Sequence, residues 1–116
     1  GDKMPIRAGF AEFRKQMLER ELKGILEMLP ILGVEKVILS GDMATGDYSP
    51  DSSIELIVVQ KTELRFGRRA DFFSYHLDSG VAVDTQVYTP EEFKELRETL
   101  PALYLACKEG RVIFDA

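Results

Sequence analysis

Three acidic side chains and a glycine turn are the residues of this chain whose types could do chemistry. Glu55 and Asp84 each lie in an apolar segment, and Asp42 follows Gly41 directly. Carboxylate oxygens are the hard ligands that Mg²⁺ prefers. By residue type alone, however, Glu55 and Asp84 are better explained as polar residues on a partly solvated sheet face.

Helices and strands that can position these residues follow from the hydrophobic pattern. Apolar residues at spacings of three and four predict a first helix with a single apolar stripe that includes Phe10, Phe13 and Met17. Consecutive or alternating apolar residues predict strands, and clusters of turn residues separate them. The predicted elements are a helix over 8–29, a strand over 34–40, a polar loop over 41–52, a strand over 53–60, a helix over 65–77, a strand over 81–88, a helix that begins with a capping box of Thr89 and Glu92, a short helix from Pro101 to Gly110, and an edge strand over 112–114.

This order of elements predicts the α/β (α+β) class. We expect one domain over 1–116, with a small mixed sheet of three to four strands flanked by helices. In a strand, residues two apart point to the same face, so Ser53 and Glu55 should share a face. We expect Asp84, on a neighbouring strand, to join them beside the turn at Gly41 and Asp42.

The segment over 39–58 resembles the signature of the nucleotidyltransferase superfamily in its minimal form. In that family a strand ends in Gly-Ser, an Ala-Arg-Gly-Asp-like turn follows, and the next strand presents two metal-binding aspartates. The segments over 83–93 and 109–114 resemble the strand with the third carboxylate and the usual end of the domain, so the likeness covers nearly the whole chain. The matching residues of the first segment are Gly41, Ala44, Gly46, Asp47, Pro50, Asp51, Ser52, Ile54 and Leu56.

The resemblance implies a nucleotidyltransferase fold and a site for Mg²⁺ and a nucleoside triphosphate. It implies that Glu55 and Asp84 hold the positions of catalytic, metal-binding carboxylates. It also implies that Gly41 and Asp42 hold the turn that receives the nucleotide. Small domains of this family often pair with a helical protein of the HEPN type as antitoxin and toxin, so the resemblance implies such a partner.

Five positions depart from the family pattern, and two of them, Met43 and Thr45, stand at the basic positions of the Ala-Arg-Gly turn. Ser53 replaces the first strand carboxylate, Glu55 is one methylene longer than the second, and Asp42 stands where the family has Ser. A carboxylate ~4 Å from a phosphate charge costs about 4 kcal/mol at an effective dielectric constant of ~20. That cost is roughly a thousandfold in affinity, so we expect weak binding of both Mg²⁺ and triphosphate. Asp42 has an alternative role as the helix cap of the turn that follows it.

The remaining candidate residues are explained by ordinary structural roles. The formal net charge is −5, so we expect no direct binding of nucleic acid. Arg65, Arg68 and Arg69 are expected on a solvated helix face. We expect His76 on the surface near a helix end. Cys107, the single cysteine, is expected in the core. No apolar run approaches a membrane span and no signal peptide is recognised, so we expect a cytoplasmic protein.

Two functions of different classes remain open, and a third is less favoured. The first is a nucleotidyltransferase-like domain that has lost catalysis and acts as a binding or regulatory module. Such a module would bind a HEPN-type partner as an antitoxin binds its toxin. The alternative is an active Mg²⁺-dependent nucleotidyltransferase in which Asp42, Glu55 and Asp84 form a rearranged carboxylate site. The third is a domain that binds a small ligand without turnover. The sequence also leaves a homo-oligomer open.

Overall fold

The computed structural model describes residues 6–77 and 79–116, and its elements follow the predicted order with shifted boundaries. The elements are α1 Ile6–Met28, the 3-10 helix η1 Leu29–Leu32, β1 Lys36–Ser40, α2 Asp42–Thr45, β2 Ile54–Val59, α3 Phe66–Leu77, β3 Val83–Tyr88, α4 Pro90–Leu96, α5 Pro101–Glu109 and β4 Arg111–Asp115. β1, β2 and β3 are shorter than predicted, β4 is longer, and the polar loop contains one short helix.

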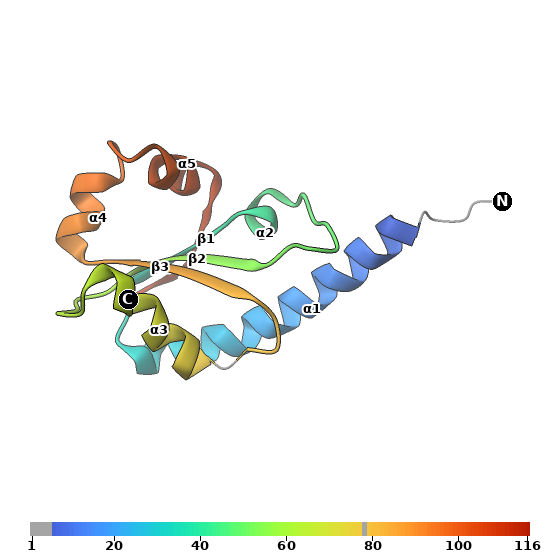
Figure 1. The fold of residues 1–116 in the computed structure, drawn as a ribbon, viewed down its shortest axis with the longest axis horizontal. Helices are drawn as coiled ribbons and strands as arrows, with labels where there is room; N and C mark the ends of the chain where they lie inside the picture. The colour runs from blue at the N-terminus through green and yellow to red at the C-terminus, as the bar shows by residue number, and fades with distance from the viewer. Residues whose placement is uncertain (1–5, 78) are drawn as a thin grey trace.

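The four strands form one mixed sheet in the order β3-β2-β1-β4 (Figure 1). β1 pairs antiparallel with both β2 and β4, whereas β2 and β3 are parallel. The parallel pair requires a crossover, and α3 supplies it. The prediction of a small mixed sheet flanked by helices is therefore confirmed.

Both faces of the sheet are covered by helices, which explains the apolar character of β1 and β2. α1 and α3 lie on one side, and α4 and α5 lie on the other (Figure 1). The larger cluster of buried side chains lies under α1 and α3 and includes Leu18, Leu56 and Phe73. The smaller cluster lies under α4 and α5 and includes Ile57 and Leu103. Since Leu56 and Ile57 are consecutive in β2, alternate residues of that strand enter the two layers.

The apolar residues of α1 do not form the single stripe that we predicted. Leu18 and Ile25 are buried, but Phe10 is 58% exposed and Phe13 is 62% exposed. The N-terminal half of α1 projects beyond the sheet, so neither phenylalanine meets the core (Figure 1). α1 has 23 residues, yet neither it nor any other described helix is both long and apolar enough to span a membrane.

Arg69 is also placed differently from our prediction of a solvated face. Its side chain is buried and donates hydrogen bonds to the carbonyl oxygens of Leu64 and Val87 and to the Glu92 carboxylate. Glu92 completes the predicted capping box with Thr89 at the start of α4. Arg69 therefore ties α3 to the end of β3 and to the first turn of α4.

Candidate functional site

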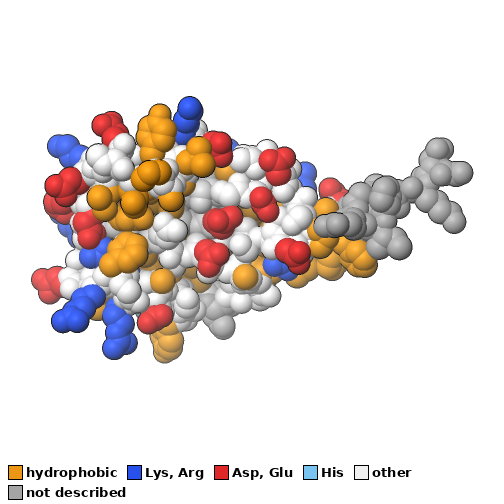
Figure 2. Space-filling model, turned by 45° about the horizontal axis from the view of Figure 1, so that its top comes forward, with side chains coloured by type: hydrophobic (Ala, Val, Ile, Leu, Met, Phe, Trp, Pro, Cys, Tyr) orange, Lys and Arg blue, Asp and Glu red, His pale blue; other side chains and the backbone are white. Residues whose placement is uncertain are grey.

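Glu55 and Asp84 are paired across β2 and β3, where both strands begin. Glu55 pairs with Ser40 of β1 on one side and with Asp84 of β3 on the other. Paired residues point to the same face of a sheet, so the predicted juxtaposition of Glu55 and Asp84 is confirmed. Their face is the one that carries α4 and α5, and acidic side chains gather on it beside a group of hydrophobic side chains (Figure 2). Like charges in register are destabilising, which sets this pair apart from a neutral sheet surface.

Gly41 joins β1 to α2 and lies against the Glu55 carboxylate. Its backbone has φ 68° and ψ −153°, a conformation that is essentially restricted to glycine. A Cβ atom at this position would fall on Oε2 of Glu55. The glycine therefore meets two requirements at once, since it permits the turn and leaves room for the carboxylate.

We expect Gly41→Ala to lower the free energy of unfolding by at least about 2 kcal/mol, because it adds backbone strain and a steric clash. Adding Glu55→Ala in the same chain should restore only the part that comes from the clash, since the positive φ remains. Urea unfolding of the parent, both single variants and the double variant measures the two parts. Equal stability of the parent and Gly41→Ala would show that the turn has another conformation in solution.

Asp42 does not act as the helix cap that the sequence suggested. Its Oδ2 atom accepts a hydrogen bond of 2.6 Å from the Ser52 hydroxyl. The Ser52 oxygen in turn accepts a hydrogen bond of 2.8 Å from the Ser49 amide. The Asp42 carboxylate therefore holds the far end of the loop over 46–53 against the start of α2. Asp42 is half-buried and remains adjacent to Gly41, the turn that the resemblance assigns to the nucleotide.

Ser53 is half-buried and lies one residue before the first residue of β2. The neighbouring amide of Ile54 donates to the carbonyl oxygen of Ala82, so the backbone is already beside β3 at this point. The strand register does not include Ser53 itself. That Ser53 shares the face of Glu55 and Asp84 therefore stays a prediction.

The donor groups described here do not fit a complete Mg²⁺ site. Over residues 6–77 and 79–116, no group of three or more His, Cys, Asp and Glu side chains is arranged to hold a metal ion. Glu55 and Asp84 supply two carboxylates on paired residues, and Ser53 holds the position to which the resemblance assigns a further carboxylate. Asp42, the replacement considered from the sequence, has its carboxylate hydrogen-bonded to Ser52 instead.

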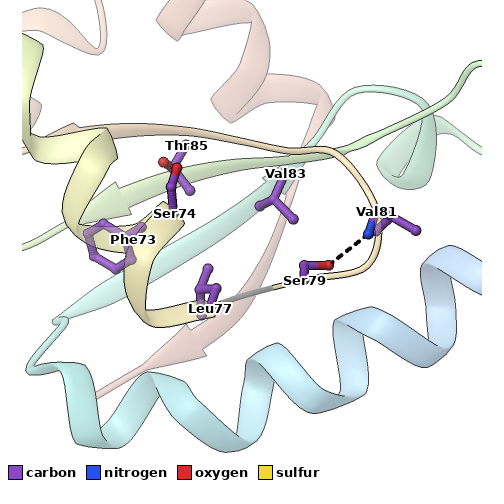
Figure 3. A pocket seen from close by; sticks show the side chains of 7 residues that line it. All are labelled: Phe73, Ser74, Leu77, Ser79, Val81, Val83 and Thr85. Atoms are coloured by element: carbon purple, nitrogen blue, oxygen red, sulfur yellow. Dashed lines mark hydrogen bonds between the residues drawn. The ribbon is translucent and has the colours of Figure 1, made fainter.

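A cavity of about 140 Å³ lies elsewhere, between the end of α3 and β3 (Figure 3). Its walls are apolar side chains and hydroxyl groups, and the Ser79 hydroxyl accepts a hydrogen bond of 3.3 Å from the Val81 amide. Val83 and Thr85 line it from β3, whereas Asp84 between them points to the opposite face. The cavity is therefore separate from the carboxylate pair. The residues that line it are Phe73, Ser74, Leu77, Ser79, Val81, Val83 and Thr85.

The other residues singled out from the sequence lie away from the carboxylate pair. His76 is exposed on α3, as expected, and packs against the Phe72 ring. Cys107 is half-buried against the smaller core cluster, and this burial raises the pKa of its thiol. No family model matches this chain, and neither a curated protein nor a solved structure matches it.

Proposed function

We propose that this chain is a nucleotidyltransferase-like domain that has lost metal-dependent nucleotidyl transfer and acts as a binding or regulatory module. The observation that carries the proposal is the alignment of Ser40, Glu55 and Asp84 across three neighbouring strands, beside the turn at Gly41. In this arrangement Glu55 and Asp84 hold the positions that the resemblance assigns to metal carboxylates, and Gly41 holds the one that it assigns to the nucleotide turn, which supports the proposal. The loss is inferred from the residues that occupy these places.

The groups around Gly41 argue against a bound triphosphate. A glycine turn leaves space for a phosphate group to approach the backbone closely. Here the Glu55 carboxylate fills that space, and the Asp42 carboxylate follows in the chain. Each negative charge ~4 Å from a phosphate would cost about 4 kcal/mol at an effective dielectric constant of ~20. Bound cations would be needed to offset this repulsion, and the described part of the chain offers an incomplete donor set for Mg²⁺.

The alternative, an active enzyme, is supported by the adjacency of Glu55 and Asp84, since two neighbouring carboxylates can share a metal ion. The two proposals differ in an assay for transfer. With Mg²⁺ and radiolabelled ATP, we expect no label on the protein itself or on added RNA, because the carboxylate replaced by Ser53 is missing. Incorporation that disappears in Glu55→Gln would establish the enzyme and overturn the proposed loss.

The proposed partner is a helical protein of the HEPN type, with antitoxin-like regulation as the outcome. We place this function in the cytoplasm, because a single cysteine fits a reducing compartment. The test is co-expression with a HEPN-like protein encoded beside this chain, followed by size-exclusion chromatography of the purified mixture. A stable complex supports the proposal. Separate elution of the two proteins at about 100 μM would exclude a regulatory complex of useful affinity.

A further inference from the structure

α1 carries a second apolar stripe that the fold of one chain does not use. At about 100° per residue, Phe10, Phe13, Met17 and Gly24 fall within roughly 60° of one another around the helix. This stripe is turned by roughly 120° from the line of residues that enters the core. Phe10 and Phe13 are mostly exposed, and Met17 is half-buried. Figure 2 shows hydrophobic side chains exposed along the part of α1 that leaves the body of the protein.

Gly24 lies on the same stripe and has no local explanation. It is exposed inside a helix, where glycine is less favourable than alanine. A Cβ atom added to Gly24 would meet nothing within 4 Å among the described residues. The fold of the monomer therefore does not require a glycine here, whereas a close approach by another helix would.

We propose that α1 pairs with α1 of a second copy of this chain, antiparallel, about a twofold axis that passes beside Met17. Phe10 and Gly24 are each seven residues from Met17, on opposite sides of it. In this arrangement Phe10 of each copy lies opposite Gly24 of the other, and the two Met17 side chains meet at the axis. The large side chain thus faces the position with no side chain, twice by symmetry.

The charges beside the stripe support a second copy as the occupant. Arg14 precedes Met17 by three residues and Glu21 follows it by four, on the same flank of the helix. The twofold axis therefore brings Arg14 of one copy close to Glu21 of the other. Within the described residues neither side chain has an ion pair of its own; Arg14 donates to the Ser52 carbonyl and Glu21 accepts from Ser79.

The contact is small, so the dimer should be weak and depend on concentration. A contact between two short helix segments buries less than the ~1,200 Å² at which specific interfaces usually begin. In sedimentation equilibrium we expect the average mass to rise from the 13.1 kDa of the chain toward twice that value as the concentration approaches about 1 mM. A mass that stays at 13.1 kDa over this range would overturn the proposal and leave the stripe to a different protein.

Variants of the stripe separate dimerisation from folding. Phe10→Ala with Phe13→Ala should lower the association constant at least roughly tenfold, because both anchors of the contact are lost. Tyr75→Ala is the matched control, since Tyr75 is an aromatic residue of α3 that is 82% exposed. It should dimerise as the parent does. Equal loss in this control, or unchanged association of the double variant, would contradict the proposed surface.

Gly24→Gln tests the close approach with two readouts of opposite direction. The monomer should melt at a higher temperature, because glutamine is a better helix former than glycine. The dimer should weaken, because the new side chain occupies the space that Phe10 of the second copy needs. A variant that melts higher and associates as strongly as the parent would overturn the assigned register.

A symmetric disulfide tests the position of the axis. In a Cys107→Ser background, Met17→Cys should form a disulfide-linked dimer under mild oxidation, because the two residues 17 meet at the axis. Lys23→Cys in the same background is the control. Lys23 is exposed on α1, and the antiparallel register separates the two copies of residue 23 along the helix. Equal cross-linking of both variants would indicate random collision and contradict the register.

Discussion

Replacing Arg69 by methionine should lower the free energy of unfolding by about 3 kcal/mol, since a buried charged hub is lost. The Arg69 side chain is 9% exposed and its hydrogen bonds reach the Leu64 and Val87 carbonyl oxygens and Glu92. Methionine keeps the apolar stem of the arginine but leaves these acceptors without their donor. Glu92 is 36% exposed, so water can replace part of its lost interaction.

Arg68→Met is the matched control for this effect. Arg68 is the preceding residue of the same helix and is exposed, so its replacement should change the free energy of unfolding by no more than about 0.5 kcal/mol. Urea unfolding followed by circular dichroism compares the two variants. Equal stability of both would show that Arg69 is not buried in solution.

The pH dependence of the same comparison identifies the charge pair. The hydrogen bond from Arg69 holds the pKa of Glu92 below its usual range, and the Thr89 amide adds to the effect. A depressed carboxylate pKa contributes stability above the unfolded pKa and loses it as the pH falls through the folded pKa. The difference between the parent and Arg69→Met should therefore be full at pH 7 and shrink as the solution is acidified below about pH 4. A constant difference would assign the effect to packing and to the hydrogen bonds with the Leu64 and Val87 carbonyl oxygens, and not to Glu92.

The secondary structure of this chain could be predicted because its local signals agree with one another. The capping box of Thr89 and Glu92 marked the start of α4, and runs of Ile and Val marked β1 and β2. The side of α1 that is buried could not be read from periodicity, because the helix extends past the sheet and its first turns have nothing to pack against. Phe10 is exposed because of where α1 lies relative to the sheet, and the hydrophobic pattern of the helix alone does not contain that information.

The burial of Arg69 could have been inferred from its spacing in α3, but we predicted one solvated face for Arg65, Arg68 and Arg69. Arg69 lies four residues before the buried Phe73, so both residues share the inner side of α3. Arg68 lies on the outer side. The spacing alone could have distinguished the two, but the acceptors of Arg69 come from β3 and α4, which are distant in sequence.

Within the site, the positions of residues on regular strands could be predicted better than those of residues in the irregular loop. The juxtaposition of Glu55 and Asp84 follows from strand alternation once β2 and β3 are neighbours, and the expectation that they are neighbours came from the resemblance. The partner of Asp42 lies in a loop without a hydrophobic period, ten residues away along the chain. A carboxylate in that context can accept from many donors, and only the folded loop selects Ser52.

Asp42→Ser combined with Ser53→Asp should bind MgATP at least roughly tenfold more tightly than the parent, because each change removes one obstacle. The first removes a negative charge from the turn at Gly41, and that charge alone could cost about 4 kcal/mol beside a phosphate. The second adds a carboxylate two residues before Glu55, directly ahead of β2, where residue 53 is predicted to share the face of Glu55 and Asp84. Three hard oxygen donors would then be available where the parent offers two.

The double variant should also lose stability, because the hydrogen bond between the Asp42 carboxylate and the Ser52 hydroxyl disappears. Hydrogen bonds to charged groups contribute about 1.5–3 kcal/mol, so the loss should be visible as a lower melting temperature.

Asp42→Ala with Ser53→Asp is the control for the serine hydroxyl itself, which could donate to a phosphate. Calorimetric titration of the parent, the two single variants and both double variants with MgATP measures the gain. Binding of the double variant that equals binding of the parent would mean that Glu55, which fills the space at Gly41, and the altered loop exclude the nucleotide by themselves. The carboxylate pair would then be something other than a damaged nucleotide pocket.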